Sequence, residues 1–306
     1  MAIDTVKVTV NGTTVNAVSN GDGTYTATLA APNVTSYNVN SGHYYPVTVV
    51  ATNMAGTATT VNDQTATLGT YLRLRVLELT APTITITSPT SGQFFGTASP
   101  EIKFTLTDES NGSGVAISTL KITVDNKTYT NTSSGVTVST ITNGYSVVCV
   151  PSTALSDGSH TVKIEIEDND GNAATSSTIS FTTDTIAPTL NVTNPAQNGA
   201  YVSEASLTVT GTTSDSTSGA PTIKITLNGS DQGTVTVTNG SFSKGVTLIS
   251  GSNTIVITAT DKAGRVTTIT RTITLDSSSP VIASVVIDPN PVNIGENYTV
   301  TIKVTG

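Results

Sequence analysis

The sequence predicts an all-β protein built from several β-sandwich domains in tandem, arranged as an elongated array. Threonine, valine, serine and asparagine dominate its 306 residues, and threonine and valine suit a pleated, half-buried strand. Short runs alternate apolar and polar residues, whereas no stretch keeps a helical period. Three sequence patterns recur at domain-scale intervals, which indicates repeated modules.

Proline-containing segments mark the boundaries between these modules. They read "LTAPTITITSP" (79–89), "TIAPTLNVTNP" (185–195) and "SSPVIASVVI" (279–287). Their spacing of about 100 residues suits one sandwich per interval. We therefore predict three β domains and a partial element of two strands, with the bounds 1–79, 80–185, 186–277 and 278–306.

Region 80–185 shows the strand pattern best. Seven short runs each have one apolar face and one face of threonine, serine or lysine, so one side should pack and the other should meet water. Two facing sheets would bury the apolar sides in one core. The predicted inward residues are Ile84/Ile86, Ile102/Phe104/Leu106, Leu120/Ile122/Val124, Val136/Val138, Tyr145/Val147/Cys149, Val162/Ile164/Ile166 and Ile179/Phe181.

An acidic or amide residue followed three positions later by glycine closes a β run in three places. Such a side chain can accept a backbone N–H within a turn, and glycine supplies the positive φ that the turn needs. We therefore interpret the motif as a turn between the last two strands of a domain. The pairs are Asn53 and Gly56, Asp168 and Gly171, and Asp261 and Gly264.

The two ends of the chain differ from its middle. The strand "VKVTVNG" (6–12) stands at the start, so region 1–79 lacks two initial strands, while 280–306 holds two additional ones. One alternative is that 280–306 adds to a sheet of another subunit. The other is that "TATLGTYLRLRV" (65–76) completes the first sheet, while the C-terminal strands dock on the third domain or continue in a longer protein.

Residues 80–276 resemble the bacterial immunoglobulin-like repeat families. The resemblance rests on the D-x-A-G pattern after a β run and on the "AP-T-I" boundary segments. In the third domain, "IKITLNGS" and "SGSNTIVITATDKAGRVTT" are similar to the Ig-like B domain first described in glucodextranases, which is an accessory module. The resemblance implies immunoglobulin-like sandwiches and no enzymatic activity. The Cys…Trp…Cys signature of antibody domains is absent, since the sequence has one cysteine and no tryptophan.

Region 1–79, with "SGHYYPVTVVATNMAGTATT", and the segment "DPNPVNIGENYTVTIKVTG" resemble parts of Ig-like proteins of tailed bacteriophages. This implies a virion protein, assembled in the host cytoplasm, that decorates a capsid or tail and attaches weakly to the host surface. Its partners would be other virion or surface subunits and a cell-surface glycan. The alternatives are a stalk of a secreted adhesin or S-layer-type protein at the cell surface, and an accessory carbohydrate-binding region of a larger hydrolase.

Charge and motifs exclude several classes of function. The net charge of −8 disfavours nucleic acid and anionic lipid as partners. The start "MAIDTVKVTVNG" does not read as a signal peptide, and no apolar run is long enough to span a membrane. No catalytic motif occurs, so we expect no enzyme. We expect His160 to face solvent and Cys149 to lie in the core.

The acidic loop "EIEDNDGN" (165–172) is the strongest candidate for a cation. Calcium takes six to eight oxygen ligands, and this loop concentrates carboxylates and an amide, although it lacks the EF-hand spacing. We predict a structural Ca²⁺ at Asp168 and Asp170 and no other cofactor. Weaker candidates are Asp108 with Glu109, and Asp184 and Asp276 before the domain boundaries.

The segment "SYNVNSGHYYP" (36–46) concentrates aromatic side chains in a chain that is otherwise poor in them. Exposed tyrosines contact sugars or protein pockets, because they are stiff and amphipathic. The candidate contact residues are Tyr37, His43, Tyr44 and Tyr45. The alternative is that one or two of these rings cap the core of region 1–79.

Overall fold

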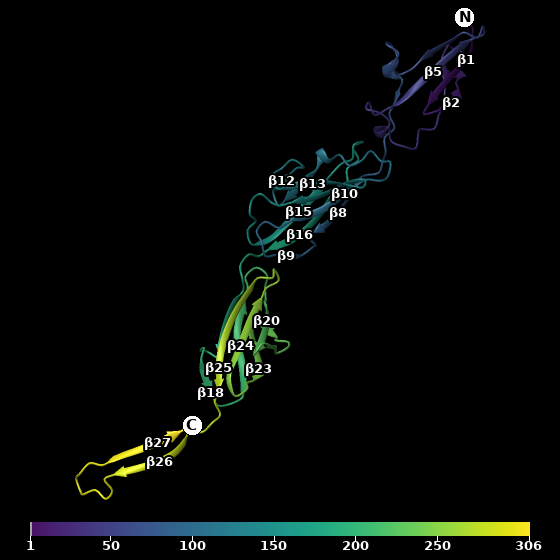
Figure 1. Cartoon of the computed structure of the whole chain (residues 1–306). Coiled ribbons are helices and arrows are strands. Elements are labelled where there is room, and N and C mark those ends of the chain that lie inside the picture. Colours follow the sequence, from purple (N-terminus) through teal and green to yellow (C-terminus); the bar gives the residue numbers. More distant parts are fainter. Residues whose placement is uncertain (1) are drawn as a thin grey trace. The chain divides into compact units, whose positions relative to one another are not determined.

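The computed structural model describes residues 2–306, and the chain is almost entirely β (Figure 1). It divides into two compact units, which are described separately: residues 2–93 with 98–183, and residues 94–97 with 184–306. Within these residues, no helix has the length and apolar character needed to cross a bilayer.

The N-terminal part of the first unit is one sheet with a small hairpin. Its sheet has the order β2 (Thr13–Asn16), β1 (Ile3–Val10), β5 (Tyr45–Asn53), β6 (Ala58–Val61), and β7 (Arg73–Leu74) also pairs with β5. The hairpin joins β3 (Val18–Ser19) to β4 (Tyr25–Thr26), and short 3₁₀ turns cover Ser36–Asn38 and Gly69–Tyr71. Segment 65–76 therefore supplies a strand to the first sheet, which was one of the two predicted alternatives.

The second part of this unit is a two-sheet sandwich. One sheet has the order β13 (Val136–Ile141), β14 (Gly144–Cys149), β10 (Ile102–Thr107), β8 (Thr83–Ser88). The other has the order β12 (Lys127–Tyr129), β11 (Lys121–Val124), β15 (Gly158–Glu165), β16 (Ser177–Thr183), β9 (Gln93–Phe95). The 3₁₀ turn Ile117–Thr119 precedes β11.

The predicted apolar faces form the core of this sandwich. Phe104 pairs with Ile86 on one side and with Val147 on the other, so three neighbouring strands present apolar residues on one face. Phe104, Val147, Ile164 and Phe181 are all at least 99% buried. Cys149 is fully buried, as predicted, and burial raises the pKa of its thiol to about 11.

The second unit contains another two-sheet sandwich. One sheet has the order β17 (Thr189–Asn194), β19 (Ser206–Ser214), β23 (Ser241–Thr247), β22 (Val237–Thr238). The other has the order β18 (Ala200–Val202), β25 (Val266–Leu275), β24 (Gly251–Thr260), β20 (Thr222–Leu227), β21 (Ser230–Asp231). Val209, Ile225, Ile257 and Ile273 are fully buried in the core that the two sheets enclose. The protein thus contains tandem immunoglobulin-like sandwiches, as predicted.

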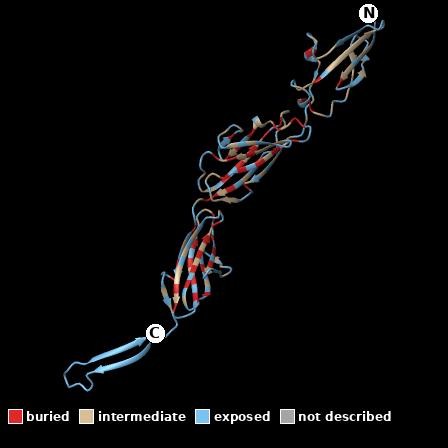
Figure 2. Cartoon of the chain, viewed as in Figure 1, coloured by how far each residue is buried: buried red, intermediate tan, exposed pale blue. Residues whose placement is uncertain are grey.

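The C-terminal residues form a hairpin without a core. β26 (Val281–Asp288) pairs with β27 (Thr299–Thr305), and every side chain of both strands is exposed, as the uniform pale blue in Figure 2 shows. A bulge between Ile282 and Ser284 places three pairs of aliphatic residues on one face. The cross-strand pairs on that face are Ile282 with Val304, Val285 with Ile302, and Ile287 with Val300.

The repeated Asx-to-glycine motif forms turns, as predicted. The Oδ1 atom of Asn53 accepts the backbone N–H groups of Ala55 and Thr57, both at 2.9 Å. The Oδ1 atom of Asp261 accepts the N–H of Arg265 at 2.8 Å. Gly56, Gly171 and Gly264 have φ values of 80°, 94° and 81°, which other residues adopt only with strain.

Candidate functional site

The loop predicted to bind calcium uses its carboxylates inside the protein. Asp168 is 2% exposed, and its Oδ1 accepts the N–H groups of Asp170 and Asn172 at 2.9 and 2.8 Å. Its Oδ2 accepts from the Asn172 side chain at 2.7 Å. The Asp170 carboxylate accepts from the Thr35 hydroxyl at 2.5 Å and from the Glu78 N–H at 3.1 Å. A cation at Asp168 and Asp170 stays a prediction.

These contacts hold the backbone of Glu78, which precedes β8, the first strand of the sandwich in the first unit. Besides the Asp170 bond, the Asn172 side chain donates to the Glu78 carbonyl at 3.1 Å. The Glu78 carboxylate then accepts the Ser113 N–H through Oε1. The loop therefore positions Glu78 from both sides of its peptide backbone.

Glu78 lies beside two other acidic residues, and we call these three the Glu78 cluster: Glu78, Asp108 and Glu109. One carboxylate oxygen from each lies within 4.8 Å of the others. Asp108 is 8% exposed and its Oδ2 accepts the Gly114 N–H at 2.7 Å. The buried atoms Asp108 Oδ1 and Glu78 Oε2 have no hydrogen-bond partner. Burial raises the pKa of Glu78 to about 7 and that of Asp108 to about 6.

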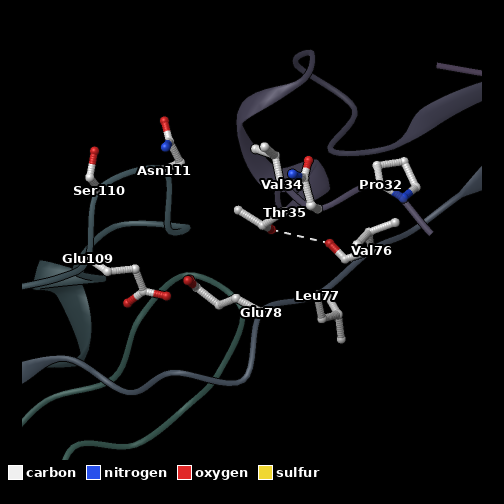
Figure 3. A pocket seen from close by; sticks show the side chains of 10 residues that line it. Pro32, Val34, Thr35, Val76, Leu77, Glu78, Glu109, Ser110 and Asn111 are labelled. Carbon is white, nitrogen blue, oxygen red and sulfur yellow. Dashed lines mark hydrogen bonds between the residues drawn. The ribbon is translucent and has the colours of Figure 1, made fainter. Parts of the chain in front are cut away.

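Space for this cluster depends on Gly112. A Cβ atom at Gly112 would lie 2.7 Å from Glu78 Oε2 and 2.8 Å from Asp108 Oδ2. A cavity of about 380 Å³ adjoins the cluster, and Glu78 and Glu109 form part of its wall. Figure 3 shows the carboxylates of these two residues pointing toward one another, below Thr35 and Val76. The cavity therefore borders two of the three residues of the cluster.

The second unit holds a similar group, which we call the Asp184 cluster: Asp184, Asp215 and Asp261. One oxygen from each again lies within 4.8 Å of the others. Asp184 is fully buried and Asp261 is 8% exposed. Their Oδ1 atoms accept the N–H groups of Ile186 and Arg265, whereas the Oδ2 atom of each has no hydrogen-bond partner. Burial raises the pKa of Asp184 above its ordinary value of 3.8.

The neighbouring cationic side chains bind elsewhere. The Lys262 ammonium lies 5.4 Å from the centroid of the Phe94 ring. The Arg265 guanidinium donates to the Thr185 carbonyl at 3.1 and 2.6 Å. Three lysines form ion pairs with Glu101, Glu165 and Asp231, which lie outside both clusters. Neither Lys262 nor Arg265 therefore neutralises the Asp184 cluster by an ion pair.

The two clusters use equivalent positions of the repeat. Glu78 and Asp184 each stand four residues before the boundary prolines Pro82 and Pro188. Asp108 and Asp215 each follow directly after a strand, β10 and β19. The sequence prediction paired Asp108 with Glu109 and named Asp184 separately, but it missed Glu78, Asp215 and Asp261 as members of a site. The recurring acid four residues before the proline was the available signal.

The rings of the aromatic segment 36–46 contact one another and neighbouring parts of the N-terminal sheet. The Tyr37 and His43 rings stack with centroids 4.2 Å apart and planes 9° apart. The Tyr44 hydroxyl donates to Asp63 at 2.9 Å, and the Arg73 guanidinium lies 4.8 Å from the Tyr44 ring centroid. Tyr45 is 5% exposed and its hydroxyl donates to the Val34 carbonyl at 3.1 Å. Tyr45 is therefore a core residue, and the role of the four residues in binding stays a prediction.

The expectation that His160 faces solvent is wrong. His160 is 6% exposed. Its Nδ1 lies 2.7 Å from Asp125 Oδ2, and its Nε2 lies 2.8 Å from the Ser156 carbonyl and 3.0 Å from Thr183 Oγ1. Burial is tolerated because both ring nitrogens have oxygen partners. Thr183 is fully buried and donates to the Ser156 carbonyl, so this arrangement offers no accessible nucleophile.

Two parts of the chain match known domain families. Residues 97–185 match the bacterial Ig-like domain, and residues 188–277 match domain B of glucodextranase. The match over 188–277 spans every strand of the sandwich in the second unit, whereas the match over 97–185 spans β10 to β16 and leaves out β8 and β9. The first of these regions is therefore similar to a bacterial Ig-like domain, and the second to a glucodextranase accessory domain. No curated protein matches the chain.

Two solved structures match the chain at low identity and low TM-score. The fibronectin(III)-like modules of Clostridium thermocellum CbhA are 20% identical, with a TM-score of 0.41, over 63% of this chain and 94% of that one. A 1.5-MDa bacterial ice-binding adhesin is 23% identical, with a TM-score of 0.33, over 89% of this chain and 86% of that one.

Proposed function

We propose that this protein is a non-enzymatic structural and adhesive protein that presents immunoglobulin-like domains at a surface. The observation that carries the proposal is the succession of two sandwiches of bacterial Ig-like families in one chain. Such modules space or present binding surfaces, and the glucodextranase domain is an accessory module. Their polar outer faces, rich in threonine, suit exposure to water.

The finer proposal is a bacteriophage virion protein attached to a capsid or tail. It is supported by the sequence resemblance of region 1–79 and of residues 288–306 to Ig-like phage proteins. A stalk of a secreted bacterial adhesin is the alternative location for the same activity. Immunogold labelling with an antibody against the chain distinguishes them: gold on particles supports the virion, and gold on the cell envelope contradicts it.

Adhesion itself is tested by binding of the fluorescently labelled chain to a panel of bacterial cells. We expect weak, saturable retention that an excess of unlabelled chain competes away. Retention no greater than that of an unrelated soluble protein would contradict the adhesive role. The variant Tyr44→Ala tests whether the aromatic segment takes part. The variant Tyr71→Ala is its control, because Tyr71 is 83% exposed and lies outside that segment.

We further propose that the C-terminal hairpin pairs with a sheet of another subunit. A two-stranded hairpin is marginal alone, and its six-residue apolar face is exposed in the structure. Strand addition would cover that face and satisfy the open edges of β26 and β27. The supporting observation is the difference between the two faces: one face holds three pairs of aliphatic residues, whereas on the other face Val281 and Val286 each pair with a threonine.

These two residues provide a matched pair of variants. Val285 is 54% exposed and Val286 is 55% exposed, so they differ in face and not in accessibility. We expect Val285→Asp to abolish concentration-dependent association measured by light scattering, and Val286→Asp to leave it in place. A wild-type chain that stays monomeric at high concentration, or equal effects of the two variants, would contradict strand addition.

A further inference from the structure

We propose that the Asp184 cluster and the Glu78 cluster are two divalent-cation sites of one design, each of which binds Ca²⁺. The proposal is independent of the adhesive function. It rests on buried carboxylate oxygens without partners, on the ligand type and spacing, and on the repetition of the arrangement in two domains.

The buried oxygens carry the first step. Asp184 is fully buried and Asp261 is 92% buried, yet the Oδ2 atom of each has no hydrogen-bond partner. In both residues Oδ1 is occupied by a backbone N–H, which leaves Oδ2 for the cluster. Desolvating a carboxylate without a partner costs several kcal/mol, so buried charges are paired or bind metal. A cation between the Oδ2 atoms would compensate this cost.

The Glu78 cluster repeats this feature. Asp108 is 92% buried, its Oδ2 accepts the Gly114 N–H, and its Oδ1 has no partner. Glu78 shows the same division, with Oε1 bonded to Ser113 and Oε2 without a partner. Each cluster thus contains two carboxylates in which the backbone fixes one oxygen and the other oxygen is buried without a hydrogen-bond partner.

The ligand type and spacing favour calcium. Carboxylate oxygens are hard ligands, and neither cluster includes histidine or cysteine, which would favour zinc. Calcium bonds to oxygen at about 2.4 Å, so oxygens on opposite sides of one ion lie up to about 4.8 Å apart. The three oxygens of each cluster lie within this limit. Water and backbone carbonyls would supply the remaining ligands.

The two clusters use equivalent positions of the repeat, which indicates that their similarity is not a coincidence. Glu78 and Asp184 occupy the same place before a boundary proline, and Asp108 and Asp215 the same place after a strand. The third ligand differs. Asp261 serves in the second unit, whereas the equivalent Asp168 is saturated by its own turn and Glu109 takes its role.

Calorimetry on the full chain tests the proposal, after chelation and transfer to metal-free buffer near neutral pH. Titration with calcium chloride should show two sites per chain. Asp261→Asn should remove one site and Asp108→Asn the other, because asparagine keeps the hydrogen-bond acceptor but not the charge. Asp231→Asn is the control, since Asp231 is exposed and pairs with Lys224 outside both clusters.

Thermal unfolding separates loss of binding from loss of folding. In chelator, Asp261→Asn and Asp108→Asn should melt at or above the wild-type temperature, because each removes a buried, uncompensated carboxylate. Calcium at millimolar concentration should raise the wild-type midpoint by several degrees and leave the double variant unchanged. Calcium heat that persists in the double variant, a response to magnesium alone, or wild-type curves that coincide in calcium and chelator would each overturn the proposal.

Discussion

The sandwich of the first unit and the C-terminal hairpin contain the same kind of strand but bury it differently. β10, "IKFTLT", and β27, "TVTIKVT", both alternate apolar and polar residues. Phe104 in β10 is 1% exposed, whereas Ile302 in β27 is 54% exposed. β10 lies between two strands and faces a second sheet, while β27 pairs with β26. Alternation therefore sets which face a side chain occupies, and a second sheet decides whether that face is covered.

The largest expected effect comes from truncating one apolar residue in each region. Phe104→Ala should lower the free energy of unfolding of the sandwich in the first unit by about 3–5 kcal/mol, because it leaves a cavity. Ile302→Ala in dilute monomer should change stability by less than about 0.5 kcal/mol. Cys149 is fully buried and is the sole cysteine, so thiol labelling in urea reports the sandwich specifically. A comparable loss for Ile302→Ala would show that the hairpin face is covered.

A smaller effect should distinguish covered and open positions within one sheet of the second unit. A Cβ atom at Gly211 would lie 2.3 Å from the Asn191 carbonyl and 2.5 Å from the Phe242 ring, whereas one at Gly245 would meet nothing within 4 Å. Gly211→Ala should therefore cost about 1–3 kcal/mol through overpacking. Gly245→Ala should be neutral or stabilising by up to about 1 kcal/mol. Urea unfolding followed by circular dichroism measures both, and equal effects would contradict the packing difference.

The smallest effect concerns the pair of Asp125 and the buried His160 in the sandwich of the first unit. The described residues of the C-terminal hairpin form no such pair with a buried member, since all side chains of its two strands are exposed. Burial by itself would raise the pKa of Asp125, but hydrogen bonds from His160 and Thr161 outweigh burial and hold that pKa below 3.8. The pair therefore stabilises the fold above pH 3.8, and this contribution is lost as the pH falls through the lower folded-state pKa.

Asp125→Asn removes this titration while keeping the side-chain shape. Urea unfolding midpoints are measured from neutral to acidic pH. Below pH 3.8, the midpoint should fall less steeply for Asp125→Asn than for the wild type. Asp157→Asn serves as a control for a general effect of removing one carboxylate from the same part of the sandwich. Parallel pH profiles for the wild type and Asp125→Asn would contradict a stabilising role of the pair.

The local chemistry of the fold was predictable from the sequence. The inward faces of the second domain and the Asx-to-glycine turns follow from period-2 alternation and from the φ preference of glycine, which depend on neighbours along the chain. His160 was misplaced because its burial depends on Asp125, 35 residues away. The acidic clusters were only partly recognised for the same reason, since Asp184, Asp215 and Asp261 are far apart in the sequence and the strands before Asp215 and Asp261 belong to different sheets.

The sequence by itself determined that the chain is β throughout, where its turns fall and which side of each strand is apolar, because these properties depend on residues within a few positions of one another. The tertiary structure decided which apolar faces are covered, where the buried histidine finds its partners and which carboxylates converge. Burial and electrostatic compensation depend on groups that strand pairing brings together across tens of residues, and no local pattern encodes that proximity.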